Sequence, residues 1–340
     1  DNDVIMLHAG DDLGWGDAGD DTLDGMVGND TLDGRGGNDL LIGGNGLDTI
    51  VLRGAFESYA ITDLGVEVRL IGPDGADTVI GAERLVFQNG VADYGDGDPL
   101  FDSLFYYSRN LDVFSFPANA KQHYETFGIS EGRDPNAFFD TDAYLAANAD
   151  VRAAGLNPLE HYRTNGFKEG RDPGRNFDIE NYLARNPDVA RAGVDPLTHY
   201  LSFGRFEGRE AIQSVGRVGA DGFDAEYYLM QNQDVALAGV DPLTHYLSFG
   251  RVEGRNPNAY FSTQGYLLQN PDVARAGVDA FTHYLQFGWT EGRDPSTLFD
   301  TDLYLQTYGD VDAANVNPLL HFLQFGATEG RVPVTDFSFN

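Results

Sequence analysis

The sequence predicts a two-part protein, an all-β coil of short strands followed by an all-α array of short helices. Three observations predict it: an aspartate that recurs every nine residues, a 38-residue repeat from residue 101 on, and a change of composition near residue 100. Residues 1–100 contain 20 of the 42 glycines but only five of the 42 aromatic residues. A glycine-rich half and an aromatic-rich half bury surface in different ways, which indicates two domains. Residues 95–99 are the expected joint, because glycine and proline together break regular structure.

Charge and residue types exclude several classes of protein. The 340 residues include 54 acidic and 22 basic ones, a formal net charge of −32, and no cysteine. Without cysteine, neither a disulfide framework nor a thiolate metal site is possible, and a chain this acidic repels nucleic acid. No apolar run is long enough to span a bilayer, so we expect no membrane span. The chain begins within a repeat and lacks a charged-then-apolar leader, so we expect no cleavable signal peptide and a fragment of something longer.

Residues 1–52 contain a nine-residue repeat of the form G-x-x-G-x-D-x-Φ-x, where Φ is aliphatic. The aspartates are Asp3, Asp12, Asp21, Asp30, Asp39 and Asp48. The glycines two residues before them are Gly10, Gly19, Gly28, Gly37 and Gly46, and a further glycine opens the later loops at Gly16, Gly25, Gly34 and Gly43. The aliphatic positions hold Ile5, Leu23, Leu32, Leu41 and Ile50, with Gly14 as the one departure. Such strict phasing argues against a disordered Gly/Asp-rich linker.

The chemistry of this repeat is suited to calcium. Glycines can take positive φ, which turns the chain and aims carbonyl groups inward. Because two copies make one full coil, loops eighteen residues apart stack on one edge, with Asp3, Asp21 and Asp39 on one edge and Asp12, Asp30 and Asp48 on the other. Only carboxylates and carbonyls then lie between stacked loops, the all-oxygen shell that Ca²⁺ prefers. We therefore predict that these aspartates and the carbonyls of the loop glycines bind about three to four calcium ions, which make the fold rather than perform chemistry.

The pattern resembles the RTX (repeats-in-toxin) nonapeptide, G-G-x-G-x-D-x-U-x, over residues 1–52. The resemblance implies a parallel β-roll that folds on meeting extracellular calcium, in proteins exported unfolded by a type I system. The second glycine of the motif is replaced in four copies, by His8, Asp17, Met26 and Arg35. Gly14 leaves one core position empty, so we expect the first coil to be frayed.

Residues 53–98 are expected to form a β cap and a linker. Alternating or apolar runs at 59–62, 66–71 and 84–87, separated by turn signals such as Asn89-Gly90, predict further strands. Residues 74–90 resemble a segment that often follows RTX rolls, D-G-x-D-T-x-x-G-x-E-R-L-x-F-x-[DN]-G. Its expected role is to cover the open edge of the roll, which would otherwise recruit other strands.

From residue 101 a longer repeat takes over. Its histidines, His123, His161, His199, His245, His283 and His321, are 38 residues apart except for one step of 46. The same register carries Tyr106, Tyr144, Tyr182, Tyr228, Tyr266 and Tyr304, and Glu-Gly-Arg triplets that begin at Glu131, Glu169, Glu207, Glu253, Glu291 and Glu329. The copies span about 101–138, 139–176, 177–211, 223–260, 261–298 and 299–333, within a helical region of 99–333, with an insertion at 212–222 and a tail at 334–340.

Each copy is expected to hold three short helices. In the third copy, Asp178 can cap Ile179–Arg185, Asn186 can cap a helix that starts at Pro187, and Asp195 followed by Pro196 starts the third. Apolar faces this small need partners, so stacked neighbours would bury them in an α-solenoid-like array of six three-helix repeats. We expect the degenerate first copy to cap the array. The glycine-rich insertion is expected to divide the array into two groups of three or to project as a loop.

The 38-residue unit resembles F-D-x-x-x-Y-L-x-x-N-P-D-V-x-x-A-G-x-x-P-L-x-H-Y-x-x-x-G-x-x-E-G-R units of secreted bacterial RTX proteins, which also occur beside some cell-surface polysaccharide glycosyltransferases. The resemblance covers residues 101–333 and says little about activity.

The six regularly spaced histidines do not predict a metal centre. Stacked helical units lie about 8–10 Å apart, whereas zinc ligands lie about 2 Å from the metal. Each histidine is expected to bond within its unit, for example to the Glu or Arg of Glu-Gly-Arg, which is itself expected to fix a turn; an outward row of arginines is the alternative. Most aromatic residues are expected in the core, with Tyr260, Trp289 and Tyr308 as candidates for exposed rings that stack on sugars.

The leading hypothesis is a secreted, calcium-stabilised, non-enzymatic interaction or adhesion protein of the bacterial cell surface or biofilm matrix. Its helical repeats would bind an extracellular glycan or a surface protein. No G-x-S-x-G, H-E-x-x-H or phosphate-binding loop occurs, so we predict no catalytic residue and no cofactor besides calcium. Two alternatives stay open: the calcium-binding and targeting part at the C-terminus of a larger secreted enzyme, and a surface-layer-type structural protein.

Overall fold

The computed structural model describes residues 1–95, 97–116 and 119–333. The chain forms two compact units, one of residues 1–137 with 201–208, and one of residues 138–200 with the chain from 209 on. The β region thus shares its unit with the first helical copy, although the composition changes near residue 100. Of the predicted segments, the tail 334–340 and part of the joint at 95–99 (Asp96) lie outside the described residues.

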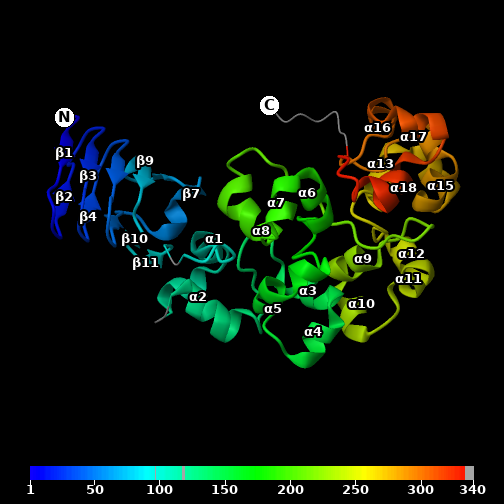
Figure 1. Ribbon diagram of the computed structural model, residues 1–340, viewed down its shortest axis with the longest axis horizontal. Coiled ribbons are helices and arrows are strands. Elements are labelled where there is room, and N and C mark those ends of the chain that lie inside the picture. Colours follow the sequence, from blue (N-terminus) through cyan, green and yellow to red (C-terminus); the bar gives the residue numbers. More distant parts are fainter. Residues whose placement is uncertain (96, 117–118, 334–340) are drawn as a thin grey trace. The chain divides into compact units, whose positions relative to one another are not determined.

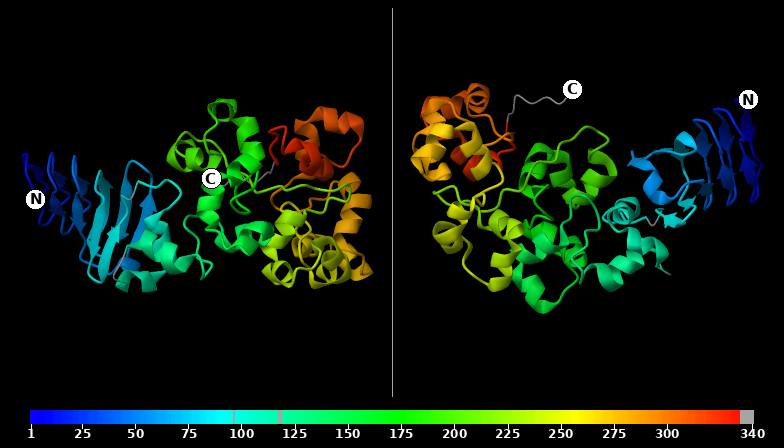
Figure 2. Two further views of the ribbon diagram at one scale, coloured as in Figure 1. Left: turned by 60° about the horizontal axis from the view of Figure 1, so that its bottom comes forward. Right: turned by 180° about the vertical axis from the view of Figure 1, so that it is seen from behind.

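The first unit begins with a coil of three-residue strands, visible as the stacked blue arrows of Figures 1 and 2. These strands are β1 (Val4–Met6), β2 (Leu13–Trp15), β3 (Thr22–Asp24), β4 (Thr31–Asp33), β5 (Leu40–Ile42) and β6 (Thr49–Val51). They pair in parallel with partners eighteen residues away, β1 with β3 and β5 in one sheet, and β2 with β4 and β6 in the other. The predicted arrangement of two parallel sheets is confirmed.

The aliphatic position of the repeat forms the core between the two sheets. Leu23, Leu32, Leu41 and Ile50 are all buried. Gly14 does not leave a hole there, contrary to the expectation of an empty position. A Cβ on Gly14 would lie 3.1 Å from the Leu32 side chain and 3.2 Å from that of Leu7, so neighbouring leucines already fill the space.

Both sheets continue into further strands from the segment expected to be a cap. This segment contains a 3₁₀ turn, Phe56–Ser58, and the strands β7 (Ala60–Asp63), β8 (Val68–Gly72), β9 (Gly75–Ile80), β10 (Arg84–Phe87) and β11 (Gly90–Asp93). The strand orders are β1-β3-β5-β9-β8-β7 and β11-β10-β6-β4-β2. β9 pairs in parallel with β5, and β10 with β6, so the last strand of each parallel stack is covered.

The first helical copy packs on these cap strands. Its helix α1 (Ser103–Arg109) is followed by a 3₁₀ segment, Leu111–Ser115, where the other copies have an α-helix, and then by α2 (Ala120–His123). The ring of Phe114 lies 4.6 Å from that of Phe56 and 5.9 Å from that of Phe87, measured between centroids. The departure of this copy from the consensus therefore supplies an aromatic contact to the β region. Pro117 of the same stretch lies outside the described residues.

The remaining copies each hold three short helices. The first helices are α3 (Thr141–Ala147), α6 (Ile179–Arg185), α9 (Ala225–Gln231), α13 (Thr263–Gln269) and α16 (Thr301–Thr307). The second are α4 (Ala149–Ala154), α7 (Pro187–Ala192), α10 (Gln233–Ala238), α14 (Pro271–Ala276) and α17 (Gly309–Ala314). The third are α5 (Pro158–Thr164), α8 (Pro196–His199), α11 (Pro242–His245), α15 (Ala280–Gln286) and α18 (Pro318–His321), and α12 (Arg251–Glu253) follows α11. A tight 3₁₀ or π turn follows each third helix.

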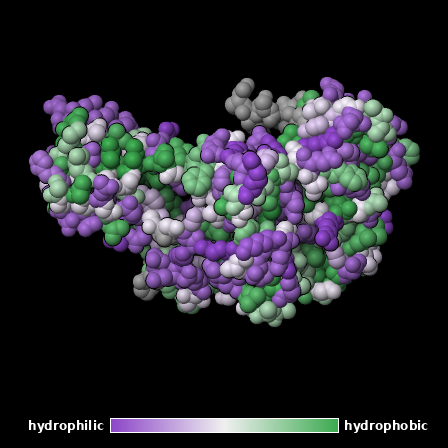
Figure 3. All heavy atoms as spheres, in the orientation of Figure 1, coloured by the Kyte–Doolittle hydropathy of each residue, from purple (hydrophilic) through white to green (hydrophobic). Residues whose placement is uncertain are grey.

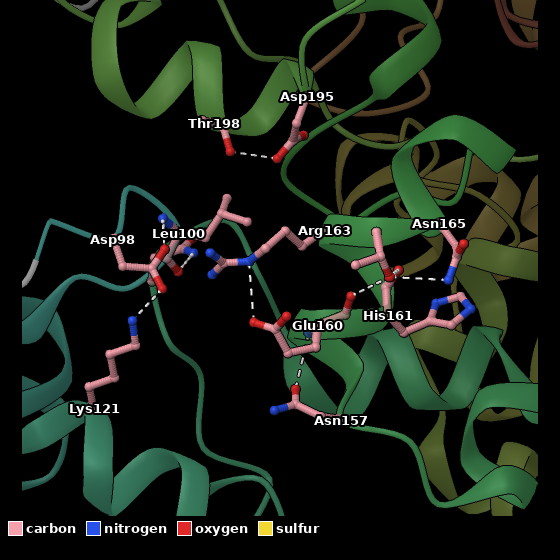
Figure 4. Close-up of polar contacts among 12 residues, drawn as sticks. Asp98, Leu100, Lys121, Asn157, Glu160, His161, Arg163, Asn165, Asp195 and Thr198 are labelled. Carbon is pink, nitrogen blue, oxygen red and sulfur yellow. Dashed lines mark hydrogen bonds and ion pairs between the residues drawn. The ribbon is translucent and has the colours of Figure 1, made fainter.

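Capping follows the sequence in the first and third helices but not in the second. Asp178 accepts a hydrogen bond from the Asn181 N–H at the start of α6. At the third helices, Asn157 accepts one from the Glu160 N–H, and Asp195 accepts one from the Thr198 hydroxyl (Figure 4). The prediction for Asn186 is wrong: its side chain makes no cap bond. Its amide instead donates to the Tyr182 carbonyl, because an arginine from the end of the copy occupies its oxygen.

Copies within the second unit do not pack only against their neighbours in sequence. α3 of the second copy packs on α9 and α10 of the fourth. Asn181 of the third copy donates to the carbonyls of Ala327 and Arg331 in the sixth. We expected the insertion to divide the array into two groups of three or to project as a loop, but it does neither. Its buried Ser214 donates to Asp172 of the second copy, and its Gly219 carbonyl accepts from Gln324 of the sixth, so it packs between copies that are distant in the sequence.

Over the described residues, no helix is long and apolar enough to cross a membrane.

Candidate metal centre

The aspartates of the nine-residue repeat form two ladders, one along each edge of the coil. On the first edge, the Asp3 N–H donates to Asp21 Oδ1 at 2.7 Å and the Asp21 N–H to Asp39 Oδ1 at 2.8 Å. On the second, the Asp12 N–H donates to Asp30 Oδ1 at 2.8 Å and the Asp30 N–H to Asp48 Oδ1 at 2.7 Å. Each bond fixes a carboxylate of one loop against the backbone of the loop eighteen residues earlier. The Oδ1 atom of each of these accepting aspartates therefore holds two stacked loops together.

The second carboxylate oxygen has no partner. The Oδ2 atoms are buried and without a hydrogen bond at Asp12, Asp21, Asp30, Asp39 and Asp48. A buried carboxylate oxygen without a partner is costly, because the charge has lost its hydration and gained nothing in return. These oxygens are therefore suited to bind a cation. Asp3 is exposed at the open end of the coil, so the pair of Asp3 and Asp21 is the least enclosed.

Glycine carbonyls and open space face the same oxygens. A Cβ on Gly16 would lie 2.5 Å from Asp21 Oδ2 and 2.9 Å from the Gly34 carbonyl oxygen. On the other edge, a Cβ on Gly25 would lie 2.6 Å from Asp30 Oδ2 and 2.5 Å from the Gly43 carbonyl oxygen. Each loop thus keeps a cradle that any side chain would fill, lined by carboxylate and carbonyl oxygens. Such hard oxygen donors fit calcium.

Three of the other predicted carbonyls have a different place. Those of Gly10, Gly19 and Gly28 press on the Cα atoms of the glycines eighteen residues later, where a Cβ would overlap them. These later glycines also have φ between 145° and 149° at Gly28, Gly37 and Gly46, which other residues rarely adopt. Glycine is therefore required at these later positions for the close approach of the loops. That the carbonyls of Gly10, Gly19 and Gly28 bind calcium stays a prediction.

Electrostatics support the same conclusion. Burial raises the pKa of Asp39 and Asp48, and a neighbouring carboxylate adds to it, Asp21 for the first and Glu83 for the second. Burial raises the pKa of Asp77 to about 6, with a further contribution from Asp39.

Among the described residues no three Asp, Glu or His side chains converge on a point that could hold a metal. A cation here would depend on backbone carbonyls for much of its shell.

A further set of hydrogen bonds between stacked loops was not predicted from the sequence. The side chains one residue before the ladder aspartates accept hydrogen bonds from loops eighteen or more residues later. The Asp20 N–H donates to Asn2 Oδ1 at 3.0 Å, and the Asn38 N–H to Asp20 Oδ1 at 2.8 Å. The same contact joins Asn29 to Asp11, Leu47 to Asn29, and Ala76 to Asn38. The signal was the Asn or Asp before five of the six repeat aspartates, all but Asp48, and in these bonds the later loop donates to the earlier one.

The residues that recur in the helical copies make contacts within their own copy. In every copy the Tyr hydroxyl bonds to the His Nδ1, from 2.8 Å at Tyr144–His161 to 3.2 Å at Tyr304–His321. The expectation that each histidine bonds within its own copy is confirmed, but its partner is the tyrosine of the copy rather than Glu or Arg. Burial lowers the pKa of His123 and His321, which favours neutral imidazoles.

The arginine of each Glu-Gly-Arg triplet fixes a turn. Arg293 forms two parallel bonds with Asp272, at 2.9 and 2.8 Å, and its Nε lies 2.6 Å from Glu291. Each of the other five triplet arginines makes the same pair of bonds, to the aspartate 21 residues before it. These guanidinium groups are engaged within the copy, so they are not a row of ligand-binding arginines.

One comparison with known proteins, the match to a repeat family, agrees with the ladder geometry. Residues 15–50 match the family described as RTX calcium-binding nonapeptide repeat, in four copies. These residues are RTX calcium-binding repeats. No curated protein matches the sequence. Among solved structures the chain is similar to the extracellular lipase LipA from Serratia marcescens, with 21% identity and a TM-score of 0.23, over 26% of this chain and 18% of the lipase. The chain therefore spans only a small part of the length of that lipase, and the RTX match ends before the helical copies.

Proposed function

We propose that calcium held between the stacked RTX loops folds the β-roll outside the cell, in a secreted, non-enzymatic protein of the bacterial surface or matrix. Proteins with RTX repeats are typically secreted, and extracellular calcium would then act as the folding signal. The observation that carries the proposal is the buried Oδ2 without a hydrogen bond at five of the six ladder aspartates, which lies beside a glycine carbonyl at Asp21, Asp30 and Asp48.

Four pairs of ladder aspartates would supply ligands for about three to four ions. On the first edge, Asp21 and Asp39 with the Gly34 carbonyl would hold one ion. On the second edge, Asp30 and Asp48 with the Gly43 carbonyl would hold another. The pairs of Asp3 with Asp21 and of Asp12 with Asp30 supply the rest. Bound calcium neutralises carboxylates that otherwise repel one another at close spacing.

A glycine substitution tests the cradle directly. Gly25→Ala places a methyl group between Asp30 Oδ2 and the Gly43 carbonyl without forcing an unusual φ. Because that group occupies the ion's position, we expect calcium titration calorimetry to show one fewer site, or at least a tenfold weaker one. Gly36→Ala is the matched control, since a Cβ there meets nothing within 4 Å. Equal calcium binding by Gly25→Ala and the native chain would contradict the proposal.

For the helical copies we propose that they bind a glycan of the cell surface or matrix, with a surface protein as the alternative. The rings expected to be exposed do not support this role. Tyr260 is buried, Trp289 packs on the core, and Arg331 covers the face of Tyr308. Instead, in five of the six copies a phenylalanine precedes the glycine of the tight turn and is exposed, at Phe127, Phe203, Phe249, Phe287 and Phe325, whereas the second copy has Asn165 there. The face drawn in Figure 3 shows hydrophobic residues among hydrophilic ones over the helical region.

These rings are suited to contact with sugars or side chains. Phe249, Phe287 and Phe325 are 53–58% exposed, and each stands 5.6–6.0 Å from the histidine ring of its own copy. The histidine is held by its tyrosine, so the phenylalanine rests on a fixed platform. A repeated exposed ring on a fixed support is typical of binding surfaces.

Binding to an array of bacterial surface polysaccharides tests this part. We expect replacement of Phe249, Phe287 and Phe325 by serine to weaken binding at least tenfold, because aromatic contacts dominate such surfaces. The control replaces three other exposed apolar residues, Leu237, Val252 and Leu268, by serine. Equal loss in both triple variants, or none in the first, would contradict a role for the phenylalanines. A blank array would favour a protein partner, and assembly with calcium by light scattering would favour a surface-layer structure.

A further inference from the structure

The segment after the RTX match contains a seventh nonapeptide that is out of phase with the first six. Residues 72–80 read G-P-D-G-A-D-T-V-I, which fits G-x-x-G-x-D-x-Φ-x. The hairpin of β7 and β8 separates this copy from the others, so its aspartate, Asp77, follows Asp39 by 38 residues rather than 18. β9 nevertheless pairs with β5 in the register of the roll, with Val79 opposite Leu41, and Val79 is buried as the aliphatic residues of the earlier copies are.

The loop of this copy stacks on the first edge as an RTX loop does. The Asp39 N–H donates to Asp77 Oδ1 at 3.0 Å, the same bond that the Asp21 N–H makes to Asp39. Gly75 has φ 140° and lies against the Gly37 carbonyl, as Gly37 lies against that of Gly19. Asp39 is 2% exposed, and its Oδ2 is unpartnered beside the cradle of Gly34.

The second edge continues in a shortened loop. The Asp48 N–H donates to Glu83 Oε2 at 2.8 Å, so Glu83 occupies the place of the next ladder aspartate. The Gly81 carbonyl faces the cradle of Gly43, as the Gly43 carbonyl faces that of Gly25. This loop has two residues from glycine to acid instead of five, and the additional methylene of glutamate spans part of the difference. Asp48 is 0% exposed with an unpartnered Oδ2, and it lines a cavity of about 260 Å³ together with Glu83.

We infer that two further calcium ions bind between the last RTX loops and the cap, one at Asp39 and Asp77, and one at Asp48 and Glu83 with the Gly81 carbonyl. This inference rests on the proposed function, because it assumes that calcium occupies the earlier loops. It raises the expected number of bound calcium ions from at most four to at most six. It also makes the cap a part of the calcium-dependent fold rather than a passive cover, since the ions join it to both ladders.

Calcium stoichiometry of the full chain, measured by titration calorimetry and by native mass spectrometry, tests the inference. We expect Asp77→Asn and Glu83→Gln each to lose one bound ion, and the double variant to lose two. Glu67→Gln is the matched control, since Glu67 pairs with Arg69 away from both ladders.

The outcomes separate this inference from the proposed function. A native chain that binds calcium at no more than four sites, or variants that keep the native number, would overturn the inference and leave the function standing. A native chain that binds no calcium would overturn both. The two substitutions lie on different edges, so if one variant fails to fold, the other variant and the native count still decide.

Discussion

Removal of calcium by a chelator is expected to unfold the β-roll. Residues 1–100 carry 21 acidic and only four basic residues, and the ladders hold the buried carboxylates in stacked loops. Each ion contributes about 2.7 kcal/mol to folding at a calcium concentration 100 times its dissociation constant. Several ions together match the whole stability of a typical domain, about 5–15 kcal/mol. Without them, short strands of three residues have too little core to stay folded.

Far-ultraviolet circular dichroism with excess calcium and then with excess chelator measures this effect. We expect the β signal to disappear with the chelator and to return when calcium is restored. The helical signal should largely remain, because the contacts inside the helical copies involve no ladder residue. Asp30→Ala should require more calcium for folding, since Asp30 takes part in two neighbouring pairs. A spectrum that does not change in chelator would contradict this expectation.

The second large effect is expected at the glycine of the tight turns in the helical copies. A Cβ on Gly288 would overlap the Tyr266 hydroxyl, which bonds to His283 at 2.9 Å. Gly288→Ala must therefore displace a fully buried tyrosine. We expect a loss of about 2–3 kcal/mol in the free energy of unfolding of the second unit, the usual scale for overpacking together with a lost buried hydrogen bond.

A double-mutant cycle shows whether the hydroxyl is the cause. Tyr266→Phe removes the atom that the new methyl group would meet, so Gly288→Ala should cost less in that background than in the native chain. Gly309→Ala serves as the control, because a Cβ there meets nothing within 4 Å. Thermal or denaturant unfolding in calcium gives the four free energies. Additive costs of the two substitutions would show that Gly288 acts through something other than the tyrosine.

The sequence predicted the roll well because its period is local. Every nine residues the same residue types return, so the strands, their partners and the aspartate ladders follow from counting. The copy at residues 72–80 was not recognised from the sequence, because a hairpin shifts it by twenty residues. Glu83 was not recognised as a ladder residue, because its loop is three residues shorter. Both become visible only when the pairing of β9 with β5 and of β10 with β6 shows which loops are neighbours.

The helical half shows the limit of the same reasoning. Recurrence identified Tyr266, His283 and Arg293 as structural residues, since a position filled in every copy serves a contact that every copy makes. It could not tell which recurring ring faces outward, so Phe287 was missed. It also could not show that the third copy packs on the sixth, because packing between distant copies depends on the path of the chain at the insertion and not on the repeat.

A crystal structure of the full chain grown in excess calcium is the most direct test of the account. It should show ions on both edges of the roll, each within bonding distance of a ladder Oδ2 and a carbonyl of the following loop. A coil with the same pairing of strands but with no ion beside Asp21, Asp30, Asp39 or Asp48 would contradict the claim that calcium makes this fold.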